Sequence, residues 1–251
     1  MFKLGWKKDP KDERDIASVR RFKVTGKKLP SNFELPYQIP VYDQGNIGSC
    51  VANSGCAAYL YELLENGKGV NDLKLSRLFA YYNIRKMNGW EDEDSGAYIR
   101  DVFKSFNKDG VSEEKFWPYL EHKFTTVPPV ESYENAKLHK AIKYARVEQT
   151  KSAIQQTLYS GATVSFGFSV YENFVYGTWD KTTGKMPKPK GEHLGGHAVT
   201  LIGWHSRKKC FLIQNSWGED WGLKGKFWMP YIYVLDPSIS DDFWCIEEST
   251  L

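Results

Sequence analysis

The stretch QGNIGSCVANSGCAAYLYELLENG, residues 44–67, joins a glycine-containing turn to a run of helix-forming residues. Ser49 is a favourable N-cap residue and Gly67 is of the type that most often ends a helix, so we predict a helix over residues 49–66. Its first turn carries Cys50, six residues after Gln44. Part of the helix is rich in small residues, which predict a buried central helix that a neighbour approaches closely: Ser54, Gly55, Ala57 and Ala58.

The position of Cys50 suggests a chemical role for its thiol. A cysteine attacks a carbonyl carbon as the thiolate, and a helix N-terminus or a nearby histidine lowers the pKa of the thiol. A single cysteine is nevertheless more often a small buried apolar residue. We adopt that second interpretation for Cys56, which falls on the apolar face of the predicted helix. Cys50 becomes a candidate nucleophile only if a histidine elsewhere can reach it.

The composition is that of a folded protein with a basic N-terminal segment. The 251 residues are 41% hydrophobic and 15% aromatic, which argues against disorder. Residues 1–30 hold 10 Lys or Arg and 4 Asp or Glu, whereas the rest of the chain is slightly acidic. The net charge of +3 is too small to indicate a nucleic-acid partner. The basic segment is either a solvated arm or one that docks on the acidic body.

No feature of the sequence indicates secretion or a membrane partner. The start, MFKLGWKKDPKDERD, lacks the apolar core of a signal peptide, and no apolar run approaches the roughly 18 residues of a membrane span. Four cysteines are too few for a disulfide scaffold. We therefore expect a cytoplasmic protein in a reducing compartment, and the state of Cys210 and Cys245 stays open.

The order of predicted elements indicates an α+β fold. Helical spacing over residues 75–87 and 97–110 follows the first helix, whereas runs rich in β-branched and aromatic residues follow Pro128 and Pro129, with one short helix near 151–160. Helices first and antiparallel strands second are typical of two lobes. We predict a basic arm over 1–30, a mainly helical lobe over 31–140 that carries Cys50, and a β-rich lobe over 141–251 whose C-terminal tail returns to the other lobe.

The histidine that Cys50 needs is predicted on a hairpin of the second lobe. If strands 197–204 and 208–215 form a hairpin centred on Ser206, His197 lies opposite Asn215. An asparagine side chain can accept the imidazole Nδ1–H and hold the ring so that its other nitrogen faces the thiol. Trp217 could shield this hydrogen bond from water. The side-chain amide of Gln44 and the backbone N–H of Cys50 are the candidate donors to an oxyanion.

The sequence blocks that carry these residues resemble, in order and spacing, the papain-like cysteine peptidases: Gln44 with Gly48-Ser49-Cys50, then Gly196-His197-Ala198-Val199, then Asn215-Ser216-Trp217-Gly218 and Trp221-Gly222. The histidine and the asparagine stand far downstream of the cysteine, as they do in this family. The resemblance implies a two-lobed papain-like fold with a helical lobe, an antiparallel β-barrel-like lobe and an active-site cleft between them.

By the same resemblance, Cys50 is the nucleophile, His197 the acid and base, Asn215 the residue that orients it, and Gln44 the oxyanion donor. The resemblance further implies an endopeptidase that hydrolyses peptide or protein substrates without a cofactor. A papain-fold peptide-binding protein, or an acyl transferase without efficient hydrolysis, is the alternative. The residues that the resemblance brings to the substrate are Gly48, Ser49, Gly96, Gly196 and Trp217.

The sequence departs from the family pattern at Ile47, Val51 and Asn53, where family members usually have a half-cystine, a tryptophan and a phenylalanine. These changes affect disulfides and packing rather than the catalytic set. Only about 40 residues precede Gln44, and the chain therefore looks closer to the compact intracellular members of microbes and viruses than to members with a long prosegment.

Three further interpretations remain to be compared with the structure. His193 and His197, with Glu192 or Cys210, could bind zinc only if residues 193–197 were helical, which two glycines and β-branched neighbours disfavour. We therefore expect no metal site.

The acidic run 91–94 is most simply a solvated loop, although at the cleft it could favour basic substrates. The basic arm, which is too polar to fold alone, is expected to lie against the body and to obstruct the cleft.

Overall fold

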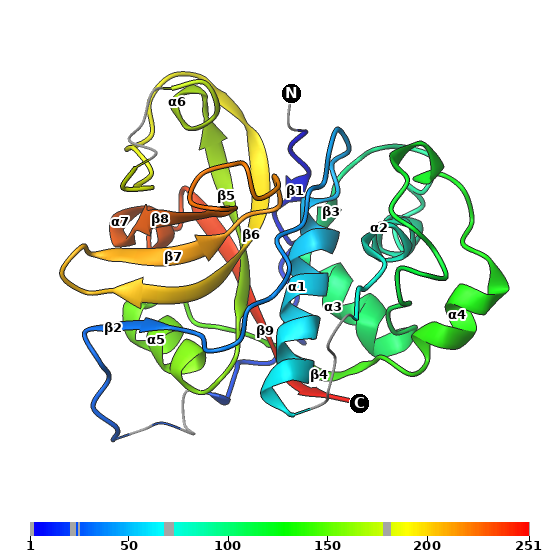
Figure 1. Cartoon of the computed structure of the whole chain (residues 1–251), viewed down its shortest axis with the longest axis horizontal. Helices are drawn as coiled ribbons and strands as arrows, with labels where there is room; N and C mark the ends of the chain where they lie inside the picture. The colour runs from blue at the N-terminus through cyan, green and yellow to red at the C-terminus, as the bar shows by residue number, and fades with distance from the viewer. Residues whose placement is uncertain (1–2, 21–23, 25, 68–72, 178–181, 251) are drawn as a thin grey trace.

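Helix α1 (Cys50–Glu65) runs through the middle of the molecule and separates a group of helices from a large sheet (Figure 1). The computed structural model describes residues 3–20, 24, 26–67, 73–177 and 182–250. Every residue of α1 from Cys50 to Leu63 is buried. The helix was predicted over 49–66, and its small residues allow the close packing that a central helix needs.

The helices beside α1 form one half of the molecule. Two of them, α2 (Arg77–Lys86) and α3 (Ile99–Lys108), agree with the predicted helices to within two residues at each end. Two short elements follow, the 3₁₀ turn η2 (Glu121–Lys123) and the helix α4 (Val130–Ala136). The side chain of Ser76 caps α2 by accepting a hydrogen bond from the backbone N–H of Phe79 at 3.1 Å.

The other half is a seven-stranded antiparallel sheet in the order β4-β9-β5-β6-β7-β8, with the short strand β2 paired to β6. The strands are β2 (Asn32–Glu34), β4 (Ala141–Arg146), β5 (Val164–Tyr171), β6 (His193–His205), β7 (Cys210–Gln214), β8 (Lys226–Pro230) and β9 (Ser240–Ser249). Helices α5 (Lys151–Tyr159), α6 (Glu172–Val175) and α7 (Tyr231–Val234) accompany the sheet. The predicted α+β class is therefore confirmed.

Two details differ from the sequence predictions. Residues 32–34, assigned to the helical lobe, form β2 and pair with β6, because their extended backbone completes an edge of the sheet. The β6–β7 hairpin is not centred on Ser206: Thr200 pairs with Gln214 and His205 with Cys210. A four-residue turn with Lys209 at φ 52° and an irregularity between Leu201 and Gly203 shift the register, so His197 is not directly opposite Asn215 along the backbone.

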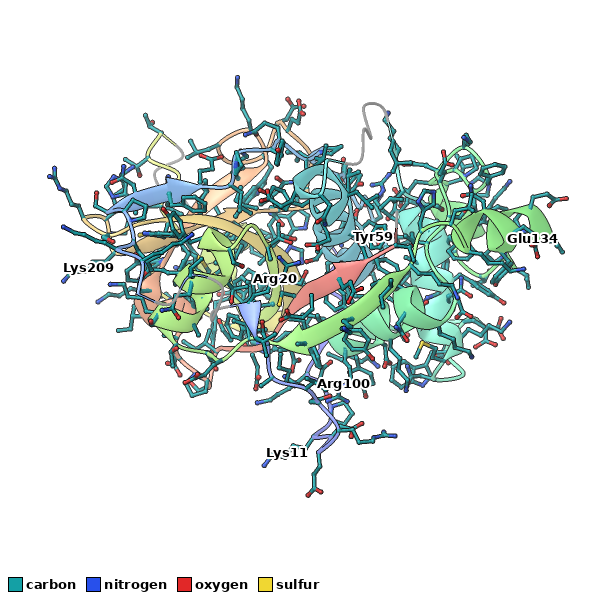
Figure 2. The ribbon with its side chains drawn as sticks, turned by 90° about the horizontal axis from the view of Figure 1, so that it is seen from below. Lys11, Arg20, Tyr59, Arg100, Glu134 and Lys209 are labelled. Atoms are coloured by element: carbon teal, nitrogen blue, oxygen red, sulfur yellow. The ribbon has the colours of Figure 1, made fainter. Side chains whose placement is uncertain are left out.

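Residues 3–20, the longest described stretch of the N-terminal arm, are tied to both halves. Strand β1 (Trp6–Lys7) pairs in parallel with β3 (Ala97–Tyr98). Further along, the guanidinium of Arg20 contacts the carboxylate of Glu62 at 2.6 Å, and both side chains are nearly inaccessible. Figure 2 shows the arm crossing the underside of the molecule, with Lys11 projecting outward.

The close approach of α1 to α3 yields a stability prediction. A Cβ at Gly55 would lie 2.6 Å from Cγ2 of Val102. Overpacking costs about 1–3 kcal/mol, whereas alanine in place of glycine gains about 1 kcal/mol in a helix. We expect Gly55→Ala to lower the free energy of unfolding, by up to about 2 kcal/mol. In a Val102→Ala chain the same change should be neutral or stabilising. Thermal unfolding measures both, and an equal loss in the two chains would contradict the clash.

Candidate active site

Cys50 is the first residue of α1 and its side chain is completely buried. The backbone amides of Ala198 and Gly5 contact its sulfur, together with the amides of Val51 and Cys50 itself. Burial nevertheless dominates and raises the pKa of the thiol to about 11. The thiol is therefore neutral at physiological pH while the arm is in place and the amide of Gly5 lies against the sulfur.

His197 is buried on β6 directly before Ala198, the residue whose backbone amide contacts the sulfur of Cys50. The Nε2 atom of His197 is 2.7 Å from Oδ1 of Asn215. This pairing agrees with the sequence-based prediction, but the ring nitrogen does not: Nδ1 is the atom left buried and without a hydrogen-bond partner in the described part of the chain. Nδ1 is thus the nitrogen available to exchange a proton.

Aromatic rings enclose the imidazole. Trp217 stacks on it with ring centroids 4.7 Å apart and an interplanar angle of 27°, and Phe168 contacts it edge-on at 5.8 Å. Trp217 is 3% exposed, so it shields the bond between His197 and Asn215 as predicted. Burial lowers the pKa of His197 to about 4, although the hydrogen bond with Asn215 acts in the opposite direction.

The side chain of Gln44 is fixed in orientation by three hydrogen bonds. Its Oε1 accepts from the hydroxyl of Ser216 at 2.8 Å, and its Nε2 donates to the carbonyl oxygens of Ile47 at 3.0 Å and Lys3 at 2.9 Å. The backbone N–H of Gln44 also donates to the carbonyl oxygen of Ser216 at 2.9 Å. An amide held in this way is a preorganised hydrogen-bond donor. In this structure it donates to a carbonyl oxygen of the arm, that of Lys3.

Three of the five residues expected to bind substrate contact the arm instead. A Cβ on Gly96 would lie 2.2 Å from the carbonyl oxygen of Gly5, and one on Gly196 would lie 2.4 Å from that of Trp6. A Cβ on Gly5 would in turn lie 1.9 Å from the carbonyl oxygen of Gly48. These approaches are too close for any side chain, which explains the glycines. The other two have contacts elsewhere: Trp217 packs on the imidazole, and the Ser49 hydroxyl bonds to Tyr119 at 2.6 Å.

Acidic residues fix the arm on both sides of the site. Lys3 forms a salt bridge of 2.7 Å with Asp94, the last residue of the acidic run 91–94, so this run borders the site rather than standing free. The indole N–H of Trp6 donates to Oδ2 of Asp242 at 3.0 Å, and the backbone N–H of Asp9 donates to the same oxygen at 2.7 Å. The roles of Trp6 and Asp242 could not be predicted from the sequence, because no local pattern relates residues 236 positions apart.

The zinc alternative lacks the geometry it needs. His193 and His197 both lie on strand β6, not on a helix, and His197 is engaged with Asn215. No group of three or more His, Cys, Asp or Glu side chains is arranged to hold a metal ion among the residues that the structure describes. In the same residues, no helix is long and apolar enough to cross a membrane.

A buried cysteine at a helix N-terminus, a histidine on a facing strand and an asparagine bonded to it, within this two-part fold, define a papain-like cysteine peptidase. The sequence model described as "Papain family cysteine protease" matches residues 36–233, and the chain therefore belongs to this family. Membership makes the chain a cysteine peptidase, and the two-lobed papain-like fold predicted from the sequence is confirmed.

Similar proteins agree with this assignment. The uncharacterized peptidase C1-like protein L477 of Acanthamoeba polyphaga mimivirus is 39% identical over 98% of this chain and 87% of its own length. The cathepsin B-like protein CP3 of Giardia intestinalis is 28% identical over 86% of this chain and 74% of its own. Among solved structures, xylellain, a cysteine protease from Xylella fastidiosa, has a TM-score of 0.90 at 36% identity and covers 97% of this chain and 95% of its own.

Proposed function

We propose that the chain is an endopeptidase in which Cys50, His197, Asn215 and Gln44 carry the reaction. The observation that supports this assignment most directly is the hydrogen bond of 2.7 Å between His197 Nε2 and Asn215 Oδ1, which leaves Nδ1 for the thiol. The sulfur of Cys50 is in contact with the backbone amide of Ala198, and Ala198 directly follows His197 in the chain.

The proposed reaction has two halves. His197 Nδ1 takes the proton of the Cys50 thiol, and the sulfur adds to the peptide carbonyl while the Gln44 amide and the Cys50 backbone N–H donate to the oxyanion. When the oxyanion collapses, the C–N bond breaks, and His197 gives its proton to the leaving amine. In the second half His197 takes a proton from water, which adds to the thioester carbonyl and releases the acid and the thiol.

Replacement of the nucleophile tests the assignment. We expect Cys50→Ala to abolish both peptide hydrolysis and covalent labelling by a peptide epoxide or vinyl sulfone, because no sulfur remains to form the bond. Cys210→Ala, which removes a thiol next to the β6–β7 turn, serves as the control and should retain both. Retained labelling of Cys50→Ala would contradict the proposal. Amide products in the presence of added amines would instead indicate the acyl transferase.

We infer in addition that the arm keeps the site closed. Support comes from four contacts: the Lys3 carbonyl on the Gln44 amide, Gly5 against Gly48 and Cys50, and Trp6 against Gly196. The arm also removes water from the site, and a dry environment favours the neutral thiol and the neutral imidazole over the charged pair. The closed chain is thus doubly inactive, because its substrate-facing surface is filled and its nucleophile is protonated.

Displacement of the arm tests this inference without touching the catalytic residues. In Gly5→Val the new side chain would overlap the carbonyl of Gly48, which should weaken docking by about 1–3 kcal/mol and raise activity roughly 10- to 100-fold. The pH at which Cys50 becomes reactive toward iodoacetamide should fall well below 11, because water reaches the thiolate. Lys11→Ala, an exposed change in the same arm, is the control. Equal activity and equal alkylation profiles for both variants would contradict the inference.

Two carboxylates give the docked arm a pH dependence. Burial, and next the charge of Asp242, raise the pKa of Asp9 to about 7, although Arg146 lies 3.2 Å from it and Trp244 donates to it at 2.8 Å. The pKa of Asp242 is also raised by its burial. Arg146 is shared with Asp15 at 2.6 Å and with Asp242 at 3.4 Å, so it neutralises Asp9 only in part.

The sign of the effect follows from proton linkage. A carboxyl whose pKa is raised in the docked state stabilises docking fully below its free pKa, near 4, and loses this contribution as the pH rises through about 7. We expect the activity of the wild-type chain, divided by that of Gly5→Val, to rise between pH 4 and 7. Asp9→Asn, which mimics the protonated acid, should flatten this ratio. A ratio that falls over this range would contradict the assigned role of Asp9.

A further inference from the structure

Tyr119 joins the two ends of the segment that carries the oxyanion donors. Its hydroxyl donates to the backbone carbonyl oxygen of Gln44 at 2.8 Å and lies 2.6 Å from Oγ of Ser49. Gln44 and Ser49 flank the turn from residue 44 to residue 49, and the backbone N–H of Cys50 follows immediately. The Tyr119 hydroxyl therefore bridges Gln44, whose side-chain amide is one candidate oxyanion donor, and Ser49, which precedes the other candidate donor, the backbone N–H of Cys50.

The Ser49 hydroxyl serves this bridge rather than the helix it precedes. Ser49 is the N-cap residue of α1, but its side chain caps no backbone N–H. Instead, Asn53 Nδ2 donates to Oγ of Ser49 at 3.0 Å and to its carbonyl oxygen at 2.9 Å. Asn53 is one of the positions at which the sequence departs from the family pattern, and in this chain its side chain makes hydrogen bonds to Ser49.

Arg77 holds the tyrosine and the asparagine in place. Its guanidinium carbon lies 3.9 Å from the ring centroid of Tyr119, and the group donates to Oδ1 of Asn53 at 3.2 Å and to the carbonyl oxygen of Asp43 at 2.9 Å. Glu114 neutralises the guanidinium at 3.2 Å. Arg77 thus fixes the carbonyl of Asp43, directly before Gln44, and Tyr119 fixes the carbonyl of Gln44.

We propose that Tyr119 is a positioning residue for catalysis, whose hydroxyl holds the Gln44 amide and the Cys50 N–H at the separation that an oxyanion requires. This proposal rests on the proposed function, because it assumes that those two groups are the oxyanion donors. A misplacement of about 1 Å can cost 100-fold in rate, and loss of a whole donor costs 100- to 1,000-fold. Loss of one hydroxyl that acts through the backbone is expected to cost less, about 10-fold.

The test separates positioning from folding by comparing two tyrosines. Tyr119→Phe removes the bridge, and Tyr133→Phe removes a hydroxyl that donates to Asn83 at 3.0 Å in the same half of the molecule. Because the oxyanion exists only in the transition state, Tyr119→Phe should lower kcat about 10-fold with little change in KM. It should weaken inhibition by a peptide aldehyde, whose adduct carries an oxyanion, by a similar factor. Tyr133→Phe should change neither, and each variant is measured in the wild-type and Gly5→Val chains.

A double mutant identifies the group through which Tyr119 acts. In a Gln44→Ala chain, Tyr119→Phe should lower the remaining kcat by less than its full factor of about 10, because the main donor that it positions is gone. The full factor in both backgrounds, or a change confined to KM, would overturn the proposal. If Tyr119→Phe does not fold, Ser49→Ala removes the other end of the bridge and should give the same pattern.

The same experiments distinguish this proposal from the proposed function. If Gln44→Ala is as active as the wild-type chain while Cys50→Ala is inactive, Cys50 remains the nucleophile but Gln44 is no oxyanion donor, and the positioning role of Tyr119 is overturned. If Cys50→Ala is active, the proposed function itself is wrong.

Discussion

The geometry of the site depends on the contact between the first turns of α1 and strand β6. Ser54, one turn after Cys50, places its buried hydroxyl 2.8 Å from Oγ of Ser165, 2.9 Å from Oγ1 of Thr200 and 3.0 Å from the carbonyl oxygen of Val199. A buried hydroxyl without partners is costly, so this contact favours one register of helix against strand. Since Val199 and Thr200 follow His197 on β6, that register determines where the imidazole lies relative to the thiol.

Much of this arrangement could be predicted because the decisive residues stand in local patterns. The cysteine after a glycine turn, the histidine in a β-branched run and the asparagine before a tryptophan each indicate their own element, and the family resemblance joins them. The hairpin register was predicted wrongly, because it depends on the φ of Lys209 and on an irregularity near Gly203 that no local pattern marks. The ring nitrogen was predicted wrongly, because it depends on how the imidazole is turned, which the sequence does not specify. The bond between His197 and Asn215 forms nonetheless, because side chains compensate for the shift of the backbone.

The path of the arm could be predicted only in outline. Its charge suggested docking on an acidic body, yet the contacts that fix it are specific: Trp6 and Asp9 on Asp242, and Arg20 on Glu62. These pairs join residues that are far apart in the sequence. Composition gives only the net charge of each segment and does not identify which residues pair. The polar network around Tyr119 was missed for a similar reason. Asn53 was visible as a departure from the family, but its partner Arg77 can be identified only after α1 and α2 are packed together.

The chemistry of the Lys3 contact explains how a closed site could remain stable. A buried carboxylate against the Gln44 amide and the thiol of Cys50 would carry a large desolvation cost. A backbone carbonyl satisfies the Gln44 amide at 2.9 Å without bringing any charge, and it leaves thiol and imidazole neutral. An arm held in this way binds through hydrogen bonds and apolar contact at the site itself. The carboxylates lie away from the nucleophile, at Asp9 of the arm and Asp242 of β9, where a change of pH can weaken docking without charging the nucleophile.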